Sequence, residues 1–364
     1  MRATSKIAAA ALAGALAFTM SACGSSSKDG DKSSAGNDIC KSQKGDGPKV
    51  GLAYDVGGRG DQSFNDSAYA GLEKIVKETD GSCVEAEAGT DETDANREDR
   101  LRTLAEQGFN PVIAVGFIYS PAASKVAAEF PDTHFAVIDG YSQFVKAAKN
   151  LTDLTFAENE GSFLVGVAAA KKTKTKTVGF VGGTHGDLIK KFEAGFAAGV
   201  KAVDPSIKVL VTYLTEDPND GKTGFENPTG GKTAAEGQLD KDADVIYHAA
   251  GKSGLGVFEA VTAAGEGKWA IGVDSDQYLT ASKDQQPHIL TSMLKRIDTA
   301  VYDYVKAVKD DSAKDGNITY DLKSDGVGYS KAGGFIDDIA SEIDGFAAKI
   351  KSGEIKVPAA PGKN

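Results

Sequence analysis

Residues 49–55 read Lys-Val-Gly-Leu-Ala-Tyr-Asp, a short apolar run that ends in an acidic residue. Residues 66–77 follow with apolar or small side chains at helical spacing, among them Leu72, Ile75 and Val76. The first stretch predicts a buried β-strand and the second an amphipathic helix. A strand followed by a helix is the repeating unit of α/β proteins, and this pair therefore indicates the fold class.

The same unit recurs along the chain in two separate series. The first series continues with strands predicted at 83–88, 111–117 and 134–140, and helices at 93–107 and 120–130. The second has strands predicted at 177–183, 208–214, 244–251 and 269–274, and helices at 186–203, 231–239 and 254–264. Alternation of this kind predicts parallel sheets with helices on both faces. We therefore expect an α/β fold with two doubly wound parallel-sheet lobes.

Two further segments, 151–156 and 289–294, have extended character and lie between the series, so we expect the chain to cross between the lobes there. A last helix is predicted at 336–350. The organisation that follows has four parts: a signal peptide over 1–22, a flexible tether over 23–47, a first lobe over 48–155 with about 295–320, and a second lobe over 156–294 with about 321–364.

The N-terminus has the pattern of an export signal. Two basic residues, Arg2 and Lys6, precede an apolar run over 7–20, and Ser21-Ala22-Cys23 follows. The cysteine stands where a lipoprotein is cleaved and acylated, and the Gly- and Ser-rich stretch after it is typical of a linker. We expect a lipid anchor on Cys23 at the extracytoplasmic face of the cell membrane. The alternative is an ordinary signal peptide that happens to contain a cysteine.

The net charge limits the kinds of binding partner that the protein can have, and the cysteines raise the question of a disulfide. The 364-residue chain has 41 Lys and Arg against 52 Asp and Glu, a formal net charge of −11. Such an acidic protein is poorly suited to nucleic acid or to a bare anionic membrane surface. Two cysteines besides Cys23 remain, Cys40 and Cys83. Because disulfides persist outside the cytoplasm, a bridge between them and two free thiols are both open.

The residues that end the predicted strands are the candidates for a site, because ligands of open parallel sheets bind beyond the carboxyl ends of the strands. Three of them are acids, Asp55, Asp139 and Asp274, and Gly251 ends another strand. Carboxylates there bind hydroxyl and N–H groups strongly, and glycine lets a ligand approach the backbone. Alternatively, each acid caps the turn or helix that follows it.

Catalytic and cofactor motifs are missing from the sequence. Three Gly-Lys-Thr/Ser triplets begin at Gly221, Gly231 and Gly251, but none has the earlier glycine of a phosphate-binding loop. A nucleophile elbow and metal-ligand spacing are missing as well. His185 and His248 either line the cleft or have structural roles. We therefore expect a protein with no cofactor, no metal and no catalytic residues.

Several stretches resemble a known family. Residues 57–65 read GGRGDQSFN and residues 271–277 read IGVDSDQ, and further similarity extends over nearly the whole mature chain. In these motifs the sequence resembles the basic membrane protein family of lipoproteins. These are type 1 solute-binding proteins, several of which bind purine nucleosides for an ABC transporter. In two places the chain departs from the family, with Gly60 where Asn is common and Lys252 where Gly is commoner.

The resemblance implies roles for individual residues. Phe64 and Phe225 match two aromatic residues that sandwich the base, and Asp55 and Asp139 match acids near it. Asp274 and Lys295 match the pair that holds the ribose hydroxyls, and Gly251 matches a backbone contact. Asp61 and Asn65, from the first motif, complete the expected ligand-binding residues.

The expected function is to capture a nucleoside, preferably a purine, between two lobes and to deliver it to an ABC transporter permease on another chain. A receptor for a monosaccharide is an alternative, because a pentose also presents vicinal hydroxyls to Asp274. A nucleoside-cleaving enzyme is a third, because acids beside a ribose can assist glycosidic cleavage.

Overall fold

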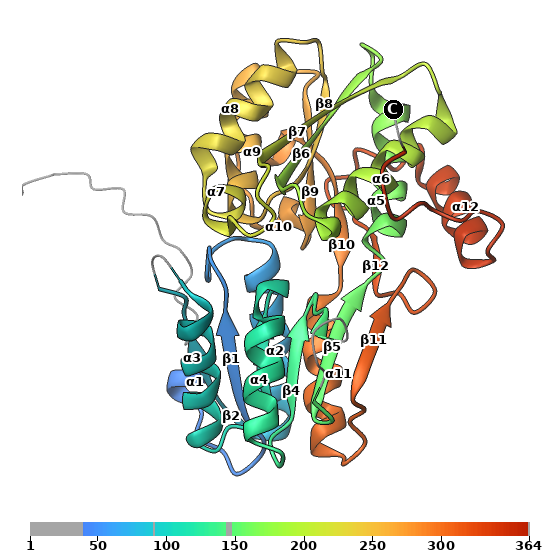
Figure 1. The fold of residues 1–364 in the computed structure, drawn as a ribbon. Coiled ribbons are helices and arrows are strands. Elements are labelled where there is room, and N and C mark those ends of the chain that lie inside the picture. Colours follow the sequence, from blue (N-terminus) through green and yellow to red (C-terminus); the bar gives the residue numbers. More distant parts are fainter. Residues whose placement is uncertain (1–38, 90–91, 143–147, 363–364) are drawn as a thin grey trace, which may run out of the picture. The chain divides into compact units, whose positions relative to one another are not determined.

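The computed structural model describes residues 39–89, 92–142 and 148–362, and these residues contain two six-stranded sheets (Figure 1). All strands of the first sheet are parallel. In spatial order they are β11 (Gly316–Tyr320), β5 (Leu151–Phe156), β4 (Phe135–Ile138), β3 (Val112–Val115), β1 (Lys49–Tyr54) and β2 (Ser82–Ala86). This is the doubly wound arrangement that the first series predicts.

The second sheet repeats this order, with one antiparallel edge strand, β12. Its strands are, in spatial order, β12 (Val327–Tyr329), β10 (Ile289–Lys295), β9 (Trp269–Asp274), β8 (Val245–Ala249), β6 (Thr177–Thr184) and β7 (Lys208–Thr215). In both sheets the central strands are mostly apolar and buried, because helices cover both of their faces. The predicted α/β class with two parallel-sheet lobes is confirmed.

Helices cover each sheet on both faces, and we call each sheet with its helices a lobe. Lobe 1 has α2 (Phe64–Thr79) packed beside α11 (Ile297–Lys309), and α3 (Asp94–Glu106) beside α4 (Ser120–Glu129). Lobe 2 has α5 (Glu158–Lys172) beside α6 (Asp187–Val203), and α8 (Pro228–Leu239) beside α9 (Gly254–Ala264). The final helix, α12 (Ala340–Lys351), packs on α5.

The chain passes between the lobes three times. It leaves β5 of lobe 1 for α5 of lobe 2, leaves β10 of lobe 2 for α11 of lobe 1, and passes from β11 to β12 (Figure 1). The segments predicted as crossings, 151–156 and 289–294, are instead strands inside the sheets. The crossings begin where those strands end, at Ala157 and Arg296.

The described chain begins with a short helix, α1 (Ile39–Ser42), fixed to lobe 1. Cys40 and Cys83 form a disulfide, and the buried Ile39 donates its backbone N–H to the Tyr69 hydroxyl at 3.3 Å. Residues 39–47 thus belong to the folded unit, so the predicted tether can comprise only residues before Ile39. The predicted signal peptide and Cys23 lie outside the described residues. No helix in the described ranges is long and apolar enough to cross a membrane.

Candidate functional site

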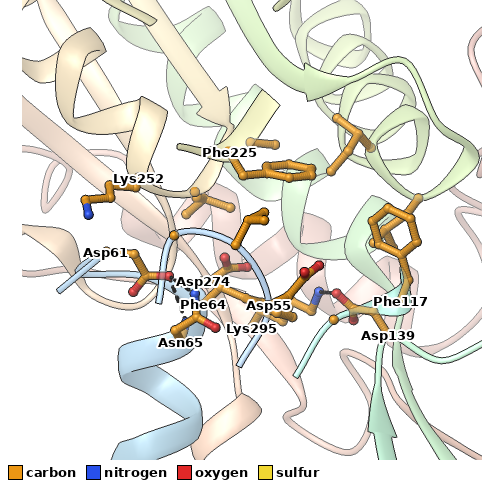
Figure 2. Close-up of a pocket in the computed structure, with 18 of the residues that line it drawn as sticks. Asp55, Asp61, Phe64, Asn65, Phe117, Asp139, Phe225, Lys252, Asp274 and Lys295 are labelled. Atoms are coloured by element: carbon orange, nitrogen blue, oxygen red, sulfur yellow. Dashed lines mark hydrogen bonds and ion pairs between the residues drawn. The ribbon is translucent and has the colours of Figure 1, made fainter. Parts of the chain in front are cut away.

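A pocket lies where the carboxyl ends of the two sheets face each other, and it encloses about 660 Å³ of space that is partly open to solvent (Figure 2). All nine ligand-binding residues expected from the sequence line it: Asp55, Asp61, Phe64, Asn65, Asp139, Phe225, Gly251, Asp274 and Lys295. Residues that the sequence analysis did not single out as ligand contacts also line it, including Phe117, Leu188, Phe192 and Lys252.

The strand-end carboxylates Asp139 and Asp274 adopt the same unusual backbone conformation. Their φ angles are +61° and +64°, in the left-handed region that few residues other than glycine and short polar residues occupy. Asp139 follows β4 of lobe 1 and Asp274 ends β9 of lobe 2. The left-handed turns thus bring one carboxylate from each lobe to the pocket.

A charge cluster formed by Asp139, Glu158, Lys191, Asp274 and Lys295 underlies the pocket, and all of its members are buried except Lys191, whose side chain is 33% exposed. Lys295, 2% exposed, places its ammonium nitrogen Nζ 2.6 Å from Asp139 Oδ2 and 3.4 Å from Glu158 Oε1. The other oxygen of Glu158 lies 3.2 Å from Lys191 Nζ. Glu158 begins α5, a helix that the sequence analysis does not predict, and so was missed.

Burial determines the protonation behaviour of this cluster. It raises the pKa of Asp274 to about 7, although Lys295 opposes the shift, and it also raises the pKa of Asp139. Burial alone would lower the pKa of Lys295, but Asp139, Glu158 and Asp274 raise it by more, so the ammonium group stays charged. The site therefore holds a permanent cation beside a carboxyl group that titrates near neutrality.

The turn before α2 is built around the Asp61 carboxylate, which is 1% exposed. It accepts hydrogen bonds from the backbone N–H groups of Ser63 (3.0 Å), Asn65 (2.8 Å) and Asp66 (3.1 Å), and from the Asn65 side-chain amide (3.1 Å). These bonds satisfy free N–H groups at the start of the helix. Asp61 thus lines the pocket while its carboxylate caps α2.

Asp55 reaches the pocket from the end of β1. Its Oδ1 lies 3.6 Å from a guanidinium nitrogen of Arg97, a residue of α3 that is only 5% exposed. Burial raises the pKa of Asp55 to about 6, although its backbone hydrogen bond and Arg97 oppose the shift. Gly116, at φ +124°, lies against this carboxyl group, and a Cβ there would come 3.2 Å from Asp55 Oδ2. Arg97 and Gly116 together fix the position of Asp55.

Aromatic side chains enter the pocket from both lobes. Phe64 begins α2 of lobe 1, whereas Phe225 ends the short helix α7 (Gly221–Phe225) of lobe 2. Both rings are half-buried. Figure 2 shows the Phe225 ring on the opposite side of the pocket from the carboxylates. A Cβ at Gly183 would overlap the Phe225 ring, so this glycine makes room for it.

Neither histidine that the sequence analysis considered lines the pocket. His185 pairs with Glu216 at an exposed position. His248 is buried beside Phe258, and burial lowers its pKa to about 4, so it is neutral at pH 7. Within residues 39–89, 92–142 and 148–362, no group of three His, Cys, Asp or Glu side chains could hold a metal.

The pocket offers mostly hydrogen-bond acceptors. The Oδ1 atoms of Asn65, Asp139 and Asp274 are buried and have no hydrogen-bond partner among the described residues, whereas Asp55 Oδ1 is paired with Arg97 at 3.6 Å. A buried acceptor without a partner costs about 1–3 kcal/mol. A ligand rich in N–H and O–H donors would recover this free energy, and flat apolar parts of the ligand could stack on the rings.

Comparison with known proteins agrees with this architecture. A family model described as ABC transporter substrate-binding protein PnrA-like matches residues 49–360. The chain belongs to this family. Members are the substrate-binding components of ABC transporters, a non-enzymatic role outside the cytoplasm, and the expectation that the protein is not an enzyme is thereby confirmed.

Individual relatives align over most of the chain. The ABC transporter nucleoside-binding protein BmpA of Lactococcus lactis subsp. cremoris is 34% identical over 332 residues, which cover 85% of this chain and 89% of the relative. A lipoprotein of Pyrococcus abyssi is 36% identical over 294 residues, which cover 77% of this chain and 68% of the relative. A crystal structure from Aeropyrum pernix K1, of a solute-binding protein of an ABC transporter system, superposes with a TM-score of 0.73 at 28% sequence identity. The superposition covers 85% of this chain and 94% of the Aeropyrum chain.

Proposed function

We propose that this substrate-binding protein captures a nucleoside, preferably a purine nucleoside, and that it is held at the outer face of the cell membrane by a lipid on Cys23. The observation that carries the proposal is the pairing of Phe64 and Phe225, one from each lobe, across a pocket rich in unpaired acceptor oxygens. A flat heteroaromatic ring with a polyhydroxylated sugar satisfies both features.

The base occupies the space between the two phenylalanine rings. Stacking on an aromatic ring contributes about 0.5–1.5 kcal/mol beyond the burial of apolar area. Asp55 and Asp139 then accept hydrogen bonds from N–H groups at the edge of the base, and such charge-assisted bonds are the stronger kind. A purine covers more of the rings than a pyrimidine, which favours it as the ligand.

The ribose is held by Asp274 and Lys295. Asp274 Oδ1 has no hydrogen-bond partner within the described chain and accepts from a ribose hydroxyl, whereas the Lys295 ammonium group donates. Gly251, at φ +51°, brings its backbone beside Phe225, where a Cβ would lie 3.4 Å from the Phe225 Cβ. The absence of a side chain therefore leaves room for Phe225, and Gly251 itself lines the pocket, where its backbone can meet the ligand.

A monosaccharide receptor is the second candidate, because the Asp274 and Lys295 pair also suits a free sugar. The apolar residues that line the pocket favour the nucleoside: Val56, Phe117, Leu188, Ile189 and Phe192 surround more apolar ligand surface than a pentose presents.

Support for the anchor comes from the position of Cys23 after an export signal and from similarity to the Pyrococcus lipoprotein. One acyl chain binds a membrane only marginally, and a lipoprotein cysteine that carries several chains anchors stably.

Isothermal titration with inosine, ribose and hypoxanthine tests the proposed ligand class. We expect inosine to bind at least 100-fold more tightly than either fragment, because only inosine contacts the rings and the ribose-binding pair together. Equal affinity for ribose and inosine would favour the sugar receptor. Release of free hypoxanthine from inosine during incubation would contradict a binding role.

A further inference from the structure

The side chain of Ser63 has an unexpected partner. Ser63 occupies the N-cap position of α2, where a serine hydroxyl ordinarily accepts a hydrogen bond from its own helix. Here it makes no such bond. Asp61 has taken over this function, because its carboxylate accepts from the N–H groups of Asn65 and Asp66.

The hydroxyl of Ser63 instead crosses to the other lobe. Ser63 Oγ donates to Asp274 Oδ2 at 2.9 Å, and it also lies 3.1 Å from the carbonyl oxygen of Val273. In return, Ser275 Oγ donates to the Ser63 carbonyl oxygen at 2.9 Å. Ser63 is fully buried and Asp274 is 8% exposed, so the hydrogen bond between them is shielded from water. Neither serine lines the pocket.

The bond from Ser63 also gives the two oxygens of the Asp274 carboxylate different roles. Ser63 holds Oδ2, whereas Oδ1 has no hydrogen-bond partner among the described residues, on a side chain that lines the pocket. Because Ser63 belongs to lobe 1 and Asp274 to lobe 2, this orientation exists only while the lobes are closed.

We propose that Ser63 is a positioning residue that acts across the two lobes: closure brings its hydroxyl to Asp274, and this contact both orients the ligand-binding carboxylate and stabilises the closed form. The orienting part rests on the proposed contact between Asp274 and ribose. The closing part needs no ligand. An affinity that depends on the closed fraction falls in proportion to that fraction.

Three variants separate these roles. Ser63→Ala removes the bond to Asp274, whereas Ser275→Ala removes a bond between the lobes without changing any partner of Asp274. Ser124→Ala is the matched control, because Ser124 is equally a buried serine but bonds only to Ser120 within α4.

Closure is measured on the ligand-free protein with spin labels at two exposed positions, Lys77→Cys on α2 and Lys201→Cys on α6, and pulsed electron–electron distance measurements. We expect Ser63→Ala and Ser275→Ala to shift the distance distribution away from the closed distance, and Ser124→Ala to leave it unchanged. Distributions identical in all four proteins would overturn the closing role, whatever the ligand.

Orientation is measured by titration with inosine and with 2′,3′-dideoxyinosine. Ser63→Ala should weaken inosine binding about tenfold, the effect of losing one bond to a charged group, and should reduce the preference for inosine over the dideoxy analogue. Ser275→Ala should weaken both ligands equally. An unchanged preference in Ser63→Ala would overturn the orienting role. Failure of inosine to bind the wild-type protein would instead refute the nucleoside proposal and leave the distance test valid.

Discussion

Replacing Asp274 with asparagine should make the empty protein more stable while it weakens ligand binding. The substitution keeps the size of the side chain and keeps an acceptor oxygen for the Ser63 hydroxyl. It removes a carboxylate whose negative charge is buried. The cation beside it is not left unpaired, because Lys295 retains Asp139 at 2.6 Å and Glu158 at 3.4 Å.

The size of the effect follows from the pKa of Asp274, which burial raises from 3.8 to about 7. A difference of this size corresponds to about 4 kcal/mol of destabilisation when the group is fully ionised. Between pH 4 and pH 7 the folded wild-type protein binds a proton that the unfolded chain has lost, so its stability falls as the pH rises through this window. The asparagine variant has no carboxyl group at this position, so its stability lacks this dependence on pH. Its free energy of unfolding should therefore match the wild type below pH 4 and exceed it by about 2–4 kcal/mol at pH 8.

Urea unfolding of the ligand-free proteins at pH 4 and pH 8 measures this difference. Asp284→Asn, at an exposed position of the same lobe, is the control and should change the free energy of unfolding by less than about 0.5 kcal/mol at both pH values. Inosine affinity of Asp274→Asn should fall about tenfold or more in the same samples. Asp274→Asn destabilised equally at both pH values would refute the reasoning, since it would make the carboxylate a structural group rather than a strained ligand contact.

Three other predictions test the base contact, the bridge and the anchor. Phe225→Ala should weaken nucleoside binding about tenfold and leave the melting temperature of the empty protein nearly unchanged; a large loss of stability with normal affinity would make Phe225 a core residue and favour the sugar receptor. The double variant Cys40→Ser, Cys83→Ser should lower the free energy of unfolding by about 2–4 kcal/mol, because the bridge closes a long loop in the unfolded chain; unfolding curves of the oxidised wild type and the variant that coincide would count against a formed disulfide. Cys23→Ser should release the protein from membranes, and fractionation that finds the variant still membrane-bound after a salt wash would rule out lipidation.

Much of the architecture can be read from the sequence because several strands, among them β1, β3, β4 and β9, are short apolar runs that end at or just before a glycine or an aspartate. The helix α9 and the strand β9 have the predicted bounds, 254–264 and 269–274, and most other elements differ by a few residues at their ends. The end of a helix depends on its capping contacts, such as those of Asp61 with Ser63, Asn65 and Asp66, and the spacing of apolar residues does not reveal these contacts.

The helix α5 could not be recognised from its periodicity. Residues 161–170 are buried on every side, against α6, β10, β12 and α12, so polar and apolar positions do not alternate. Glu158 at its start was missed for the same reason. The helix α11 was not predicted either, although Ile297, Ala300, Val301, Tyr304 and Val305 are buried at helical spacing and this signal is present in the sequence.

The residues that form the candidate site can be predicted from the sequence, but the hydrogen bonds and ion pairs among them cannot. Strand-end position and the family resemblance together indicate the nine residues that the structure brings to one pocket. That Arg97 supports Asp55 and that Ser63 reaches Asp274 depends on packing between separate segments, which for the second pair are 211 positions apart. No local pattern specifies such pairs.

Mass spectrometry of the small molecules released when the purified protein is denatured tests the central claim most directly. A pocket with buried, unpaired acceptors between two lobes should retain its ligand through purification, and we predict a purine nucleoside in an amount that approaches one per protein. Phe225→Ala, purified in parallel, should release much less of it. A free sugar, or any ligand that lacks an aromatic ring, would contradict the account.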